Sequence, residues 1–163
     1  MHALLLARDG VRALLDGRNP QRRALAQSLG IDTVDAGDTL GKEAVLAETA
    51  GRGADAVIDC TGSASVWESA PELVRRGGAV SFFGGLPEGT RVSFTSGRVH
   101  YDEIRLISPF HFAPDNVKRA RDVIASRALP LGALLSHAYS LDHIADAFAL
   151  LDAGEGTKMV IEP

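Results

Sequence analysis

Several arginines gather near the start of the chain, around an asparagine and a proline. Residues 14–23 read LLDGRNPQRR, where Gly17 and Arg18 precede Asn19, the expected N-cap of a helix, and Arg22 lies in its first turn. In a nucleotide-binding α/β protein, such a stretch closes the second strand and lies at the ribose of the cofactor. The open alternative is that these arginines are solvated charges at the beginning of a helix.

Other residues capable of chemistry carry weaker patterns. None of the five histidines forms an H-x-x-x-H or H-E-x-x-H pair, and no cysteine stands at ligand spacing. We therefore expect no metal site and no zinc. The only cysteine, Cys60, is expected to be a small core residue rather than a nucleophile, and Asp59 has no base or hydroxyl partner that the sequence indicates. No catalytic residue is predicted.

Composition limits the class of protein. The chain has 163 residues, 45% hydrophobic and 23% charged, which fits one domain with a full core. A net charge of −4 argues against nucleic-acid binding, which needs a basic surface. One cysteine excludes an internal disulfide framework and fits the reducing cytoplasm. The apolar run 3–7 is too short for a signal peptide or a membrane span, so no membrane partner is expected.

Apolar strands and helical patterns alternate along the chain. Residues 3–7 are expected to end a helix, and uninterrupted apolar strands between helices indicate a parallel sheet covered on both faces, a doubly wound α/β fold. The helices at 115–129 and 140–154 are expected to face the core. The predicted strands are 11–15, 32–35, 54–59, 79–85, 90–94, 103–110 and 157–163, and the other predicted helices are 19–30, 41–53 and 63–78.

The order of five motifs resembles a known family. From Val11 to Pro163 the chain is similar to the coenzyme-binding domain and C-terminal end of a zinc-type medium-chain dehydrogenase, the alcohol and sorbitol dehydrogenase family. The resemblance implies a Rossmann-like fold. Family members also carry a catalytic zinc domain and a G-x-G-x-x-G loop, so we expect residues 1–163 to be a single dinucleotide-binding-like domain truncated at its N-terminal strand, either naturally or as a fragment. The motifs are GRNPQRRALAQSLG, ADAVIDCTG, RRGGAVSFFGG, HYDEIRLISPFHFAP and KMVIEP.

The resemblance also implies cofactor contacts. Where NAD-using relatives place an acidic residue at the ribose, this chain has Gly17, which with Arg18 and Arg22 favours NADP; if Asp16 holds that position instead, the preference reverses. The alternative for Gly62, Gly84 and Gly85 is that the fold itself needs them as turns. The implied cofactor-binding residues are Gly17, Arg18, Asn19, Arg22, Cys60, Thr61, Gly62, Phe83, Gly84, Gly85 and Leu86.

Function and partners are expected from the same resemblance. The chain resembles the NAD(P)-binding half of an alcohol or polyol oxidoreductase, expected to bind NADP or NAD weakly and to be inactive alone. A non-catalytic assembly or ligand-binding module, and a dehydrogenase fold recruited to another reaction, remain alternatives. The strand Thr90 to Phe94 matches the edge through which relatives pair, which predicts a homodimer, with a monomer covered by its own N-terminal helix as the alternative. A separate zinc-domain polypeptide is a further implied partner.

Overall fold

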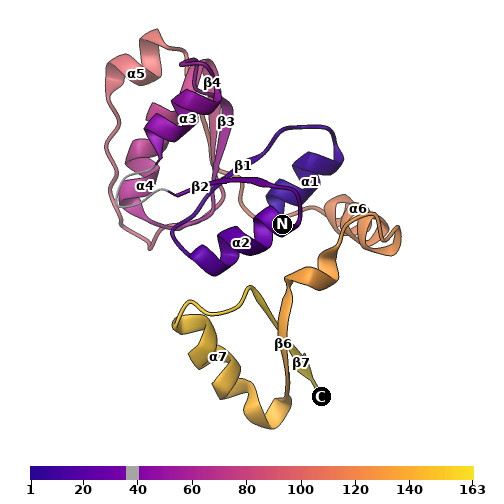
Figure 1. Cartoon of the computed structure of the whole chain (residues 1–163). Helices are drawn as coiled ribbons and strands as arrows, with labels where there is room; N and C mark the ends of the chain where they lie inside the picture. The colour runs from indigo at the N-terminus through magenta and orange to yellow at the C-terminus, as the bar shows by residue number, and fades with distance from the viewer. Residues whose placement is uncertain (36–40) are drawn as a thin grey trace. The chain divides into compact units, whose positions relative to one another are not determined.

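The computed structural model describes residues 1–35 and 41–163, and its chain divides into two compact units. Unit 2 is the continuous segment Asp35–Phe112, and unit 1 combines Met1–Val34 with Ala113–Pro163 (Figure 1). The strands form three parallel sheets, in the orders β1-β2, β3-β4-β5 and β6-β7. The predicted parallel, Rossmann-like α/β fold is thereby confirmed, whereas a single domain over 1–163 stays a prediction.

Unit 2 contains the three-stranded sheet. β4 (Val74–Phe82) lies between β3 (Ala54–Asp59) and β5 (Arg105–Ile107), with Val57 opposite Val80 and Val80 opposite Leu106. The connections contain α3 (Lys42–Glu48), α4 (Ala64–Ser69), the 3-10 helix η1 (Ala70–Leu73) and α5 (Ser96–Tyr101). Because parallel strands need crossover connections, this alternation places the carboxyl ends of β3 and β4 at one edge.

An aromatic stack closes the core of unit 2. The buried side chains of Val80, Phe82 and Ile104 belong to one cluster, against which Trp67 and Phe94 pack. The rings of Trp67 and Phe82 are stacked with centroids 4.1 Å apart, and those of Phe82 and Phe94 are 6.0 Å apart. β4 thus presents its alternate side chains to one hydrophobic core, which fixes its register against β3.

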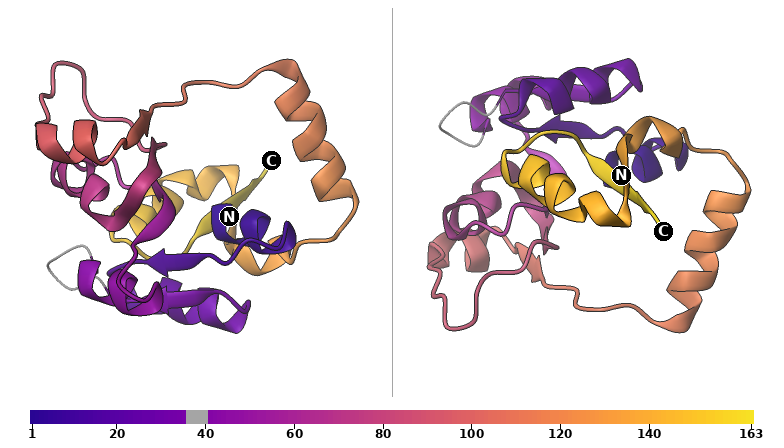
Figure 2. Two further views of the ribbon diagram at one scale, coloured as in Figure 1. Left: turned by 90° about the horizontal axis from the view of Figure 1, so that it is seen from above. Right: turned by 90° about the horizontal axis from the view of Figure 1, so that it is seen from below.

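Unit 1 is assembled from the two ends of the chain. β1 (Leu14–Asp16) pairs with β2 (Asp32–Val34), and β6 (Leu135–Ser140) pairs with β7 (Lys158–Glu162). The buried residues Leu4, Ala26 and Ile31 pack against Leu15 and Leu134. The helices are α1 (His2–Arg8), α2 (Pro20–Ser28), α6 (Pro114–Ala125) and α7 (Ile144–Asp152), with 3-10 helices η2 (Leu131–Leu134) and η3 (Leu141–His143). Figure 2 shows α7 beside the β6–β7 pair.

Several predicted elements have different boundaries, and the largest difference is at the beginning of β4. The helix predicted over 63–78 ends at Leu73, and β4 begins at Val74, five residues before the predicted strand. Between the pairs Ala54–Val74 and Ala56–Ala79 the register of β4 shifts, and Gly77 has a φ of +69° within this irregular part. A helix cannot continue through such a conformation, whereas a β-bulge accommodates it.

The strand predicted from Thr90 to Phe94 is wrong for the isolated chain. These residues pair with no strand of the described chain. The amide of Ser93 instead donates to Glu68 Oε1 at 2.9 Å, and Phe94 packs against the core of unit 2. The backbone of this segment is therefore anchored by side-chain contacts rather than by a ladder, and pairing with a second copy stays a prediction.

The expectation that both late helices face the core holds only in part. α7 buries Ala147, whereas α6 buries no residue, and its Val117 and Ile124 are exposed. The core cluster of unit 1 and the hydrophobic residues packed against it include no residue of α6, and on its apolar face Val123 is half-buried. No helix of the described residues is both long and apolar enough to cross a membrane.

Candidate functional site

The turn after β1 brings four predicted site residues together. Asn19 caps α2, since its Oδ1 accepts a hydrogen bond from the Arg22 amide at 3.0 Å. Its Nδ2 donates to the carbonyl of Gly154 at 3.0 Å, and Arg22 Nε donates to the carbonyl of Gly156 at 3.0 Å. These donors of Asn19 and Arg22 are thus used inside unit 1, on the turn that precedes β7.

Arg18 differs from these two residues. It is exposed, and its guanidinium makes no hydrogen bond or ion pair with the described part of the chain. The backbone of the turn is held by Arg23, whose Nη1 donates to the carbonyls of Gly17 at 2.6 Å and Arg18 at 3.1 Å. All guanidinium donors of Arg18 are therefore available to a ligand, and the exposed Arg22 keeps its two terminal nitrogens. Arg23 supports the turn, a role that the sequence does not indicate.

The end of β1 bears on the choice between the two cofactors. Asp16 is the last residue of the strand, paired with Val34, and Gly17 follows directly. One carboxylate oxygen of Asp16 is buried, so this oxygen does not face solvent where a ribose would lie. Asp16 and Gly17 are both half-buried, and of the two Gly17 carries no charge to repel a phosphate.

The end of β3 centres on Asp59, which is only 3% exposed. Its Oδ1 accepts hydrogen bonds from the amide of Thr61 at 3.0 Å and from Thr61 Oγ1 at 2.6 Å. Its carbonyl accepts from the amides of Phe83 and Gly84, both at 2.9 Å. Asp59 thereby joins the loops that follow β3 and β4. The sequence indicated no hydroxyl partner for Asp59, yet an aspartate bonded to the residue two positions later is a common turn that could have suggested Thr61.

The glycines of these two loops are required by their close approach. A Cβ on Gly84 would lie 2.5 Å from the amide nitrogen of Gly62 and 2.9 Å from that of Thr61. Gly62 has a φ of +66°, and its Cβ would lie 2.9 Å from the carbonyl oxygen of Gly85. A Cβ on Gly85 would meet no atom within 4 Å. This geometry favours a role in the fold for Gly62 and Gly84, and their contact with a cofactor stays a prediction.

The remaining predicted residues line the same loops. Cys60 is exposed, so the expectation of a core position is wrong; it follows the last residue of β3, Asp59, and lies in the loop. Partial burial and then the charge of Asp59 raise the pKa of the Cys60 thiol, which disfavours the nucleophilic thiolate. Phe83 is exposed and Leu86 is half-buried. The carbonyl of Gly84 accepts from Trp67 Nε1 at 3.0 Å, which ties this loop to the core.

Among residues 1–35 and 41–163, no group of three His, Cys, Asp or Glu side chains lies close enough together to hold a metal ion. The histidines make other contacts. His143 Nδ1 lies 2.9 Å from Asp146 Oδ2, and the rings of His100, His111 and His137 lie beside aromatic neighbours. The expectation that the chain binds no zinc stays a prediction.

Comparison with known proteins identifies the family. The zinc-binding dehydrogenase family matches residues 6–126, which is most of the chain. The chain belongs to this family. YphC, an uncharacterised zinc-type alcohol dehydrogenase-like protein of Escherichia coli, is 31% identical over 99% of this chain and 46% of its own length. D-arabinitol dehydrogenase 1 of Uromyces fabae is 25% identical over 80% of this chain and 37% of its own length.

Solved structures of the dehydrogenase family share this fold. A zinc-binding dehydrogenase from Sinorhizobium meliloti, bound to NADP, has a TM-score of 0.85 and 30% identity, and covers 98% of this chain and 48% of its own. Benzyl alcohol dehydrogenase from Acinetobacter calcoaceticus has a TM-score of 0.86 at 19% identity. The chain thus spans less than half the length of these relatives and corresponds to the coenzyme-binding part of alcohol and polyol dehydrogenases.

Proposed function

We propose that this chain supplies the cofactor-binding part of an NADP-preferring alcohol or polyol oxidoreductase. The observation that carries the proposal is the turn after β1, where the exposed Arg18 guanidinium has available donors and Gly17 brings no negative charge. A guanidinium fits a phosphate by two parallel hydrogen bonds. The NADP bound to the 30% identical relative supports the same choice.

The cofactor fits these residues in part. In unit 1, Arg18 would bind the 2′-phosphate. Contacts of the loops 60–62 and 83–86 of unit 2 with a cofactor are a separate proposal, which rests on the rule that open α/β sheets bind ligands at the carboxyl ends of their strands. When bound, the nicotinamide supplies the hydride acceptor. The printed sequence has no G-x-G-x-x-G loop to hold a pyrophosphate. Since each charge-assisted hydrogen bond contributes about 1.5–3 kcal/mol, we propose weak binding by the 163-residue chain alone.

Replacing Arg18 by alanine tests the cofactor preference. Isothermal titration calorimetry of the R18A variant is expected to show about tenfold weaker NADP binding than wild type, from the loss of roughly 1.5 kcal/mol of hydrogen bonding to the 2′-phosphate. NAD, which lacks this phosphate, should change less than about twofold. Arg12→Ala is the matched control, because Arg12 is an exposed cation before β1 that pairs with Asp32 at 3.0 Å.

Two results would contradict the proposal. Equal weakening of NAD and NADP in the R18A variant would remove the 2′-phosphate role from Arg18. Low-micromolar NADP binding by the wild-type chain would contradict the proposed weakness. We also propose that this chain alone turns over no alcohol or polyol, with or without added zinc, and the absorbance of reduced nicotinamide measures this directly.

Pairing of two copies through residues 90–94 is proposed as the mode of assembly. Val92 and Phe94 are half-buried while Arg91 and Ser93 are exposed, an alternation that suits an added strand. Val92→Pro removes one amide donor, so light scattering should show a dimer for wild type and dissociation for the variant. Val92→Ala, which keeps the amide, is the control. A wild-type monomer at high micromolar concentration would overturn this assignment.

A further inference from the structure

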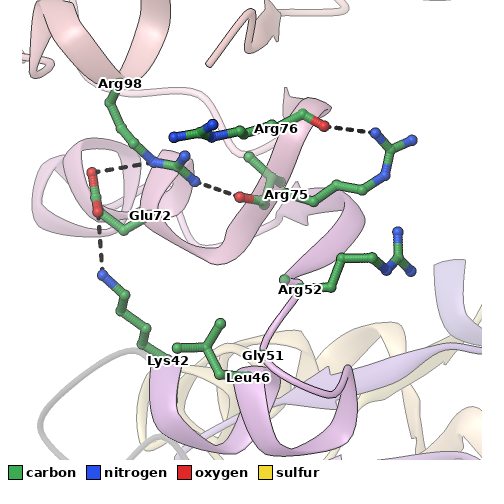
Figure 3. Close-up of a pocket in the computed structure, with 10 residues that line it drawn as sticks. Lys42, Leu46, Gly51, Arg52, Glu72, Arg75, Arg76 and Arg98 are labelled. Atoms are coloured by element: carbon green, nitrogen blue, oxygen red, sulfur yellow. Dashed lines mark hydrogen bonds and ion pairs between the residues drawn. The ribbon is translucent and has the colours of Figure 1, made fainter. Parts of the chain in front are cut away.

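A basic pocket opens at the amino ends of β3 and β4 in unit 2. Its volume is about 410 Å³, within the range of small-molecule sites. Figure 3 shows the arginine and lysine side chains of the lining, of which Lys42 and Arg98 contact Glu72. The only apolar side chains of the lining are Leu46 and Val74, so an apolar ligand finds little surface there. The cationic lining residues are Lys42, Arg52, Arg75, Arg76 and Arg98.

Nearby carboxylates hold these cations but do not balance their charge. Asp55 accepts from Arg52 Nη1 at 2.7 Å and from Arg75 Nε at 2.6 Å, and these hydrogen bonds keep the pKa of Asp55 far below its usual range. Asp102 pairs with Arg98 and with Arg76. With Glu72, three carboxylates face five cations, which leaves two positive charges in excess.

Two of the cations keep donors for a ligand. Arg76 is held by Asp102, with its Nε at 2.9 Å, and its side chain is 86% exposed, so its two terminal nitrogens remain accessible. Lys42 Nζ has one contact, with Glu72 Oε2 at 3.2 Å, and an ammonium has three donors. Arg98 is fixed more firmly, because it also donates to the carbonyls of Pro71 and Val74. The pocket therefore combines a firmly held cation, Arg98, with two cations, Lys42 and Arg76, whose remaining donors can bind a ligand.

We propose that this pocket binds a small anion that carries linked phosphate groups, with Lys42 and Arg76 as its direct ligands. Linked phosphates supply two or more negative charges, which matches the excess positive charge of the lining. β3 begins at Ala54 beside the pocket and ends at Asp59 beside the loops 60–62 and 83–86. The pocket lies at the opposite end of the strand from those loops, and it is a second, separate site.

Titration of inorganic pyrophosphate into the full chain tests this site. Wild type should bind with a dissociation constant below about 1 mM at low salt, and the K42Q/R76Q variant should bind at least about tenfold more weakly. The control K118Q/R121Q removes two exposed cations of α6, which pair with Asp115 and Asp122, and changes the net charge equally. Its affinity should stay within about twofold of wild type.

A gain of affinity provides a test that misfolding cannot imitate. Glu72→Gln removes the only carboxylate among the lining residues and releases Lys42 and Arg98, so pyrophosphate should bind about threefold to tenfold more tightly. Arg18→Gln distinguishes this pocket from the cofactor turn and should leave pyrophosphate binding unchanged. Absence of binding, equal loss in K118Q/R121Q, dependence on Arg18, or no gain in E72Q would each overturn the proposal.

Discussion

Truncation of Phe82 to alanine is expected to lower the free energy of unfolding of unit 2 by about 3–5 kcal/mol. Phe82 is 4% exposed and lies between the rings of Trp67 and Phe94. Its removal deletes both ring contacts and leaves a cavity whose walls cannot close, because β4 is hydrogen-bonded on both sides. A loss of this size is a large fraction of the stability of a typical domain.

Urea unfolding followed by tryptophan fluorescence measures this loss. Trp67 is the only tryptophan of the chain and lies in unit 2, so its emission reports on this unit alone. Phe110→Ala is the matched control, because Phe110 is 85% exposed and its loss should change stability by less than about 0.5 kcal/mol. Similar midpoints for the two variants would show that the aromatic stack does not support the core.

Adding one methyl group at Gly84 is expected to destabilise unit 2 by about 1–3 kcal/mol. The new Cβ would lie 2.5 Å from the Gly62 nitrogen and 2.9 Å from the carbonyl carbon of Cys60, both backbone atoms that cannot rotate away. The loops after β3 and β4 would have to separate. The amide of Gly84 would then lose its 2.9 Å hydrogen bond to the carbonyl of Asp59.

Gly85→Ala is the adjacent control for this effect. Its Cβ would meet no heavy atom within 4 Å, so its stability should stay within about 0.5 kcal/mol of wild type. If G84A binds NADP more weakly than G85A while both remain folded, the junction of the two loops also shapes the cofactor site. Equal stability of the two variants would contradict the close approach of the loops.

The sequence predicted those elements whose signals are local. The apolar run at 54–59 coincides with β3, and the cap Asn19 followed by Pro20 marks the beginning of α2. The sequence does not predict β6 (Leu135–Ser140), because its residues LSHAYS mix polar and apolar types and form a strand only by pairing with β7. The sequence predicts a helix at the bulged beginning of β4 because its arginines suit a helix as well as a strand.

The sequence predicts where the candidate site residues lie along the strands, but it does not predict the hydrogen bonds that these residues make. The motif ADAVIDCTG and the glycines after β4 placed the two loops at the strand ends, where the structure joins them through Asp59. No local pattern shows that Asn19 and Arg22 bond to carbonyls more than 130 residues later. The basic pocket was likewise invisible, because its arginines lie on separate elements that meet only after folding.

The division of unit 1 into two distant segments constrains the order in which the protein folds during synthesis. Residues 35–112 form a continuous unit that can collapse as soon as they leave the ribosome, as domains generally do. Asn19 and Arg22 must wait for Gly154 and Gly156, which are 135 and 134 residues further along the chain. The entropic cost of closing so long a loop is smaller once the intervening unit is compact, because a folded insert shortens the flexible chain between the two ends. We therefore expect early compaction of unit 2 to lower the entropic cost of bringing the two segments of unit 1 together.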